Sequence, residues 1–319
     1  MSDSKHRNTS LDAVKAIAAI SVVFLHYNHV DGEIGEIYTR IIFNITTFAV
    51  PFFFMITGYF LIALVENHRD KGYLKKILQM ALCSTAFYFL YNVVVSGDGL
   101  DWIKNHYTIG PVFTWLTGQD DPAGFHLWYF YCLLWSFTIV TSIYKLFNVG
   151  TLYALALIML VYHFSGAGMF SCYTVSIPAM VLGIALYKNK TLINRVPANA
   201  VFGCAIVMLF LMGLEAYYNI GKPGFYYEGH ILALIIFILA IRIPTALNSS
   251  GLAYIGLECS ALIYILHVFV NGIFSFVIDY RTIPLQVLKP WIVFGGSLGL
   301  AMICGYVSKL KLNYGAYKD

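Results

Sequence analysis

Blocks of apolar residues, each about as long as a membrane-spanning helix, recur along almost the whole chain. A helix needs about 20 mostly apolar residues to cross a bilayer. Charged residues make up only 11% of the 319 residues, whereas a soluble chain carries about a quarter. The sequence therefore predicts an all-α, polytopic membrane protein with about ten transmembrane helices, at residues 12–30, 41–65, 77–95, 126–147, 151–165, 173–187, 199–218, 229–243, 252–277 and 287–308.

Two of these blocks are short and contain helix-interrupting residues. Residues 165–168 (SGAG) follow the fifth block, and Pro178 lies in the sixth, so we expect both spans to be interrupted there. The first block has no small-x-small cleavage site before Tyr27 and is followed by many further spans. We interpret it as an uncleaved helix and not as a signal peptide.

The longest polar stretch is too short for a separate soluble domain, because it runs only from about residue 96 to 124. We therefore expect a single transmembrane domain over residues 1–319, with a short cytoplasmic segment at 1–10 and a cytoplasmic tail at 309–319. An extracellular or catalytic soluble domain is not expected, so the sequence predicts a stand-alone membrane protein.

The distribution of Lys and Arg predicts the orientation in the membrane. An even number of spans places both termini on one side, and cytoplasmic termini put 15 of the 20 Lys and Arg inside. The prediction is a multi-pass protein of the plasma membrane with cytoplasmic termini. Its partner is the lipid bilayer, and the net charge of +4 does not indicate nucleic acid. Aromatic residues near the span ends, such as Trp102, Tyr107 and Trp115, are expected in the interfacial belt.

Lys15 and His26 both lie in the first apolar block, eleven residues apart. Eleven residues are close to three helical turns, so the two side chains share one helix face, roughly 16 Å apart along the axis. Ionisable groups within a membrane span are costly to bury. Two of them on one face indicate a polar path through the helices and a protein that performs chemistry.

Each member of this pair has a structural and a functional interpretation. His26 either forms a hydrogen bond between helices or accepts a proton from a hydroxyl group; the lysine on the same face favours the second. Lys15 either extends to the inner headgroups or meets a phosphate or a developing negative charge. Asp12, one turn earlier, is expected to pair with Lys15 and reduce the cost of its burial. His29 is expected at the membrane interface.

Further polar residues lie at span ends and inside one late span. The basic residues Arg69, Lys75 and Lys76 either mark topology or bind the phosphates of a nucleotide donor. His126 is by itself expected to be interfacial. A chamber for a polar substrate is expected from Trp128, Glu258, Tyr264 and His267, because an intramembrane glutamate or histidine is a functional candidate by default.

Several familiar signatures are missing from the sequence. The six cysteines are scattered, with no CxxC or Cys/His spacing, so neither a disulfide framework nor a metal site is predicted. There is no Ser/His/Asp elbow, Walker loop or GxGxxG stretch. We expect no metal and no tightly bound cofactor.

The ordered motifs resemble the membrane acyltransferase-3 family. Residues 11–19 (LDAVKAIAA) are similar to its LDxxRAIA-like run, in which a basic residue lies ten intervening residues before a histidine. Residues 50–60 (VPFFFMITGYF) are similar to its FFxxSGF stretch. Lys75-Lys76 and residues 126–129 (HLWY) follow, and residues 260–267 (SALIYILH) look like its late SxxxYxxH segment.

The resemblance, closest to Gram-positive members and to the membrane part of vancomycin-resistance serine racemases, implies an O-acyltransferase, in first place an O-acetyltransferase. It implies acetyl-CoA or another acyl-CoA as a cytoplasmic donor and a hydroxyl of an envelope glycan or lipid-linked saccharide as acceptor. His26 would be the base or acyl carrier, with Lys15 as a catalytic and donor-binding residue, and Arg69, Lys75 and Lys76 would meet the donor. Lys15 stands where the family usually has arginine, so it lacks the planar fork that grips a phosphate in two bonds.

Two other functions stay open from the residues alone. The same polar path would suit a transporter of serine or a small acyl metabolite, for which inverted repeats and broken helices would be typical. A non-catalytic partner in surface-polymer assembly would tolerate substitutions at both Lys15 and His26. A homo-oligomer is compatible with each of these functions.

Overall fold

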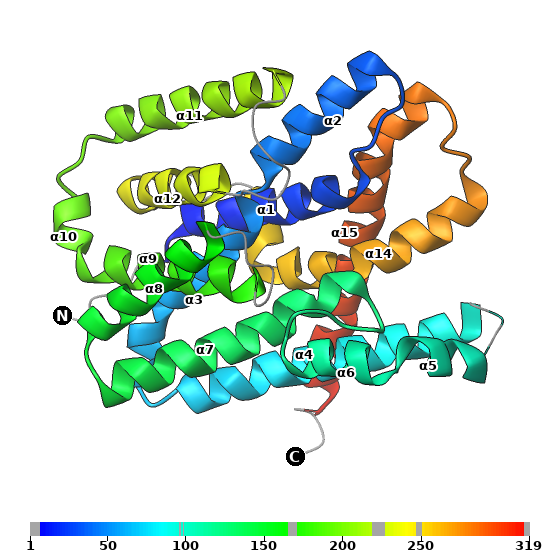
Figure 1. Ribbon diagram of the computed structural model, residues 1–319, viewed down its shortest axis with the longest axis horizontal. Coiled ribbons are helices and arrows are strands. Elements are labelled where there is room, and N and C mark those ends of the chain that lie inside the picture. Colours follow the sequence, from blue (N-terminus) through cyan, green and yellow to red (C-terminus); the bar gives the residue numbers. More distant parts are fainter. Residues whose placement is uncertain are drawn as a thin grey trace. The chain divides into compact units, whose positions relative to one another are not determined.

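Helices are the regular elements throughout the described part of the chain (Figure 1). The computed structural model describes residues 7–95, 97, 99–164, 171–218, 227–246 and 251–315. The helical elements in chain order are α1 (Thr9–Tyr27), α2 (Glu33–Thr46), α3 (Ala49–Glu66), α4 (Asp70–Val95), α5 (Leu100–His106), α6 (Ile109–Leu116), η1 (Phe125–Leu127), α7 (Trp128–Leu146), α8 (Val149–Phe164), α9 (Ser171–Lys188), α10 (Lys190–Ile193), α11 (Ala198–Tyr218), α12 (Tyr227–Arg242), α13 (Gly251–Tyr254), η2 (Ile255–Cys259), α14 (Ser260–Val277) and α15 (Ile283–Gly315).

A polytopic membrane protein is confirmed by the length and composition of these helices. Within the described residues, eight continuous helical stretches are long and apolar enough to cross a bilayer. Helices α8 and α12 occupy two more of the expected spans but have only 16 residues each. The total of ten spans and the cytoplasmic termini therefore stay predictions.

Two spans differ in detail from the expectation. Pro178 does not interrupt the sixth span, because α9 continues through it from Ser171 to Lys188. Within a membrane helix bundle, neighbouring groups can satisfy the carbonyl that a proline leaves without a partner. The ninth span is not a uniform α-helix, since Ile255–Cys259 form a π-helical turn between α13 and α14. The 165–168 interruption lies outside the described residues.

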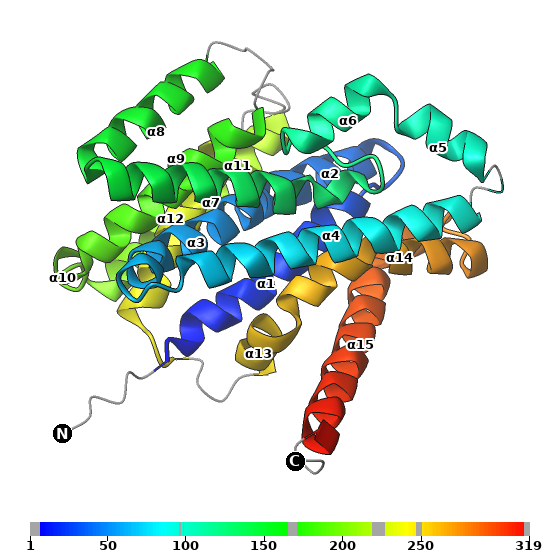
Figure 2. The ribbon, with the colours of Figure 1, turned by 90° about the horizontal axis from the view of Figure 1, so that it is seen from below.

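The chain forms two compact units, residues 1–53 with 190–319 and residues 54–189. In the first unit, α1 is the central helix and packs against α2, α12, α13, η2, α14 and α15 (Figure 2). Its fully buried alanines, Ala13, Ala16, Ala18 and Ala19, allow neighbouring backbones to approach closely. Farther along, α1 and α14 share an apolar core that includes Val23 and Ile263.

In the second unit, α7 packs against α4, α8 and α9. Helices α3 and α9 approach through two glycines. A Cβ atom on Gly58 would overlap the backbone of Met180, and one on Gly183 would overlap the backbone of Met55. These contacts use the small-residue packing that is typical of membrane helices.

Candidate functional site

Two basic side chains share one buried carboxylate at the start of α1. Asn8 caps this helix by accepting a hydrogen bond from the Leu11 N–H at 2.9 Å. Asp12, in the first turn, pairs with Arg7 Nε at 2.6 Å and with Lys15 Nζ at 3.1 Å. The expected Asp12–Lys15 pair is confirmed. The pairing of Arg7 with the same carboxylate was not predicted from the sequence. Arg7, Lys15 and Asp12 together carry a net charge of +1.

The π-helical turn η2 lies against this same end of α1. A Cβ atom on Gly256 would overlap the carbonyl of Asp12 and crowd the Ala16 N–H, so the two backbones are in direct contact. Glu258 belongs to this turn and is exposed. It precedes His267 by nine residues, or about 13 Å along a helix. The structure therefore places Glu258 near the Asp12 end of α1 and does not bring it beside His267.

The opposite end of α1 holds a pair of stacked histidines. The rings of His26 and His267 are nearly parallel, with an interplanar angle of 14° and centroids 5.3 Å apart. His267 is fully buried, whereas His26 keeps an exposed side chain. Tyr27 and Tyr264 also contact the His267 ring, with centroid distances of 6.0 and 5.9 Å. His26, Tyr264 and His267, three of the residues predicted to form the site, are thus brought together by the packing of α14 on α1.

The hydrogen bond of His267 defines how its ring is protonated. Its Nδ1 lies 2.6 Å from the carbonyl oxygen of Tyr264. A carbonyl only accepts hydrogen bonds, so Nδ1 carries the proton and donates it. In the neutral ring, Nε2 then has the lone pair. This bond within α14 also fixes the plane of the ring on which His26 stacks.

A lysine that was not among the predicted site residues lies next to this cluster. Lys289, in the second turn of α15, places its Nζ over the rings of Tyr27 and Tyr280, 5.4 and 4.9 Å from their centroids. Among the described residues, no carboxylate lies within ion-pair distance of it. Its position inside the predicted span at residues 287–308 is a signal that could have singled it out, because an ionisable residue within a span is a functional candidate.

The segment after α1 is fixed to α15 by hydrogen bonds. Gln286 accepts a hydrogen bond from the Asp31 N–H at 2.9 Å and donates one to the Asp31 carboxylate at 2.5 Å. The side chain of His29, which is 76% exposed, lies 3.2 Å from the other Asp31 carboxylate oxygen. His29 is therefore not part of the histidine stack, although it follows His26 by only one turn.

The remaining predicted site residues belong to the second unit. Arg69, Lys75 and Lys76 are exposed around the beginning of α4. Exposure is expected both for a topology signal and for residues that bind the phosphates of a donor. Nearby, Asp70 pairs with Lys145 at 2.6 Å and ties α4 to α7. Trp128 begins α7, half-buried and beside Tyr129.

A buried polar cluster lies between α4 and the segment that precedes α7 in the second unit. His126 is fully buried against the ring of Tyr88, with centroids 4.7 Å apart, and its expected position at the membrane interface stays a prediction. Asp121 is 2% exposed and accepts hydrogen bonds from Thr85 Oγ1 at 2.5 Å and the Ala123 N–H at 2.8 Å. Burial raises the pKa of the Asp121 carboxyl, and the nearby Asp120 raises it further.

Replacing Asp121 with Asn is expected to reduce the pH dependence of folding. Because the pKa of Asp121 is higher in the folded protein, its contribution favours folding most at low pH. That contribution is lost as the pH rises from about 4, the usual aspartate pKa, through the raised pKa that Asp121 has in the folded protein. Melting temperatures measured in detergent from pH 4 to 8 should fall less with pH in Asp121→Asn than in the unmodified protein. Asp101→Asn is the control, because the Asp101 side chain in α5 is 72% exposed. Equal slopes for all three proteins would contradict the assignment.

The chain is similar to one protein family and to two racemases. The family model described as an acyltransferase domain, acyltransferase-3, matches residues 8–309. An amino-acid racemase of Enterococcus faecalis is 34% identical over 137 residues, which are 40% of this chain and 18% of the racemase. A serine/alanine racemase of Enterococcus gallinarum is 30% identical over 149 residues, 43% of this chain and 20% of that protein.

These alignments thus cover about a fifth of the length of each racemase. No solved structure matches the chain. The family match, in contrast, includes both ends of α1, the π-helical turn, the histidine stack and the first turns of α15. The chain belongs to the acyltransferase-3 family of membrane acyltransferases.

Proposed function

We propose that this protein is an O-acyltransferase, in first place an O-acetyltransferase. It moves an acyl group from acyl-CoA to a hydroxyl of an extracytoplasmic glycan or lipid-linked saccharide. The single observation that carries the proposal is the stack of an exposed His26 on a buried, oriented His267, in a chain of the acyltransferase-3 family. The proposed location is the plasma membrane, with both termini in the cytoplasm.

In the proposed reaction, His26 acts as the general base. It takes the proton of the acceptor hydroxyl while the hydroxyl oxygen attacks the thioester carbonyl. A C–O bond forms, the carbonyl becomes a tetrahedral oxyanion, and the C–S bond then breaks. The proton passes from His26 to the departing thiolate, which leaves as free CoA. An acyl group carried briefly on His26 itself would give the same products.

His267 is proposed as a positioning residue for this step. It is buried and its Nδ1–H is committed to the Tyr264 carbonyl, so its ring has a fixed plane. A ring stacked on that plane loses much of its rotational freedom before the substrate arrives. Holding a catalytic group in a reactive orientation is a major source of rate enhancement.

The donor is proposed to bind through positive charge at the other end of α1. Lys15 is already paired with Asp12, so Arg7 and Lys15 together offer one net positive charge to a phosphate. This pairing supports an electrostatic role for Lys15 that does not need the bidentate grip of an arginine. In the second unit, the exposed Arg69, Lys75 and Lys76 are proposed to contact the phosphates of CoA.

Lys289 is proposed to stabilise the negative charge that develops during transfer. Lys289→Met keeps the aliphatic stem but removes the ammonium group, and losing one group that stabilises an oxyanion costs about 10²–10³-fold in kcat. We expect a loss in this range or somewhat below it, with Lys289→Arg retaining most activity because arginine also stacks on tyrosine. Initial rates of labelled acetyl transfer in membrane vesicles would measure the effect.

Arg281→Met is the matched control for Lys289. Arg281 is 89% exposed and already paired with Asp279 at 3.3 Å, so removing its charge should leave the rate within twofold. Thermal melting of each variant separates loss of activity from loss of folding. Equal activity of folded Lys289→Met and the unmodified protein would contradict the proposed role of Lys289.

The function itself is tested with radiolabelled acetyl-CoA added to inverted vesicles that contain the native envelope acceptors. Transfer of label to a glycan or lipid-linked saccharide, only in vesicles that contain the protein, is the expected result. The same vesicles, loaded with labelled serine, report transport. Flux of serine without covalent labelling of any acceptor would replace the acyltransferase proposal with a transporter.

A further inference from the structure

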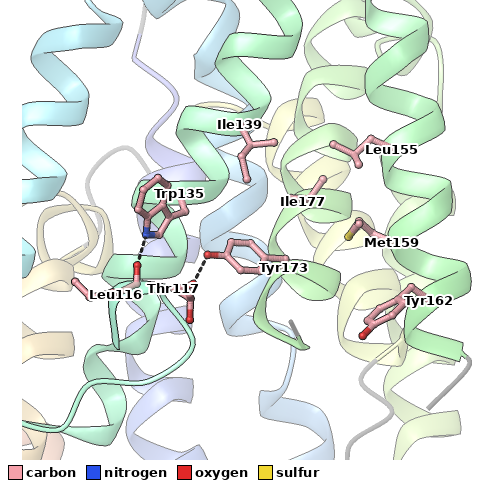
Figure 3. A pocket seen from close by; sticks show the side chains of 9 residues that line it. All are labelled: Leu116, Thr117, Trp135, Ile139, Leu155, Met159, Tyr162, Tyr173 and Ile177. Atoms are coloured by element: carbon pink, nitrogen blue, oxygen red, sulfur yellow. Dashed lines mark hydrogen bonds between the residues drawn. The ribbon is translucent and has the colours of Figure 1, made fainter. Parts of the chain in front are cut away.

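A cavity in the second unit is lined by none of the residues assigned so far. It has a volume of about 500 Å³ and lies between α7, α8, α9 and the end of α6 (Figure 3). Ligand pockets in proteins usually have volumes of about 300–1,000 Å³. The three helices that line it are apolar, and α7 and α9 belong to stretches long enough to cross a membrane.

The lining residues form short stripes at helical spacing. Trp135 and Ile139 are one turn apart on α7, and Tyr173 and Ile177 are one turn apart on α9. On α8, Leu155 and Met159 are one turn apart, and Tyr162 follows. Such i, i+4 pairs lie one above the other on a helix face. The cavity therefore runs along the helices, for about 10 Å on α8.

The two ends of the cavity differ in polarity. Ile139, Leu155 and Ile177 line one end, whereas the phenols of Tyr162 and Tyr173 lie at the other, where α8 ends and α9 begins. At this polar end Tyr173 donates a hydrogen bond to the Thr117 carbonyl. Trp135 Nε1 donates one to the Leu116 carbonyl at 3.0 Å. A ligand that fits is apolar along its length and polar at one end.

The shape and the lining favour one kind of occupant. At the end lined by Ile139, Leu155 and Ile177, water would find too few hydrogen-bond partners to be held. A single hydrocarbon chain packs against these side chains without needing such partners.

We infer that this cavity binds one acyl chain of a glycerophospholipid, with the glycerol and headgroup at the Tyr162–Tyr173 end. Hydrocarbon leaving the bilayer gains little from the hydrophobic effect. Binding therefore depends on close packing against Leu155, Met159 and Ile177 and on polar contacts at the phenols. This site requires neither the proposed donor nor the proposed acceptor, so it stands independently of the acyl-transfer reaction.

The test uses the full chain in nanodiscs that contain phosphatidylglycerol with a photoreactive diazirine in one acyl chain. After illumination, peptide mass spectrometry should find label concentrated on the cavity-lining residues of α7, α8 and α9. Leu155→Trp fills the cavity and is expected to lower labelling of the α9 peptide at least fivefold. Met159→Trp and Ile139→Trp provide the same test if Leu155→Trp does not fold.

Ile158→Trp is the matched control on the same helix. Ile158 is 60% exposed and does not line the cavity, so this variant should be labelled as strongly as the unmodified protein. Equal labelling of the α9 peptide in all folded variants would show contact with bulk lipid only and overturn the proposal. It would also fail if unlabelled farnesyl phosphate removed the label more effectively than unlabelled phosphatidylglycerol, since the occupant would then be an isoprenoid.

Discussion

Replacing His26 with Ala is expected to lower acyl transfer by about 10²–10⁴-fold, the range for loss of a general acid–base group. The reason is that the proposed reaction assigns the acceptor proton to the exposed ring of His26, and His267 is fully buried and bonded to the Tyr264 carbonyl. Donor binding should change little, because the Arg7–Asp12–Lys15 cluster lies at the other end of α1. The measurement is the initial rate of labelled acetyl transfer, together with the dissociation constant for acetyl-CoA.

His29→Ala is the matched control for His26. Both are histidines one turn apart, but His29 faces Asp31 and is 76% exposed. We expect His29→Ala to keep transfer within about twofold of the unmodified rate. A folded, membrane-inserted His26→Ala protein with undiminished transfer would remove His26 from the mechanism. A loss of equal size in both variants would show that the region, and not the His26 ring, is responsible.

The second large effect is expected for Gly256→Ala, through stability. The added Cβ would overlap the Asp12 carbonyl, which is backbone and cannot rotate away as a flexible side chain can. Overpacking of this kind typically costs about 1–3 kcal/mol. The π-helical turn must then separate from α1, which moves Asp12 and the two cations that it holds. We expect a lower melting temperature in detergent and weaker binding of acetyl-CoA.

Gly213→Ala in α11 is the matched control. A Cβ atom there meets nothing within 4 Å, so alanine should be neutral or should stabilise the helix by about 0.5–1 kcal/mol. Equal melting temperatures for Gly256→Ala and Gly213→Ala would contradict the close contact between η2 and α1.

Prediction from the sequence was most successful for the membrane helices themselves. Apolar blocks report directly on helices because each is a local property of about 20 consecutive residues. The Asp12–Lys15 pair was predictable for the same reason, since residues three apart on a helix are neighbours. The continuity of α9 through Pro178 was not, because neighbouring helices determine whether a proline interrupts a span.

The site shows the same division between local and tertiary information. The sequence motifs pointed to His26, Tyr264 and His267 as separate residues, and the family resemblance implied a role for His26. Only the packing of α14 on α1 placed the two imidazole rings parallel at 5.3 Å. The position of Lys289 over Tyr27 likewise depends on the packing of α15 on α1. These two helices come from opposite ends of the sequence.

The sequence by itself determined which segments are apolar helices and which ionisable residues they carry, because hydropathy and helical spacing are local. The tertiary structure decided which of those residues share a site. Glu258 and His267 are close in sequence, yet they lie at opposite ends of α1, since a helix extends by about 1.5 Å per residue. His26 and His267 are distant in sequence but stack, because two helices that bury small and apolar faces against each other bring side chains from separate segments together.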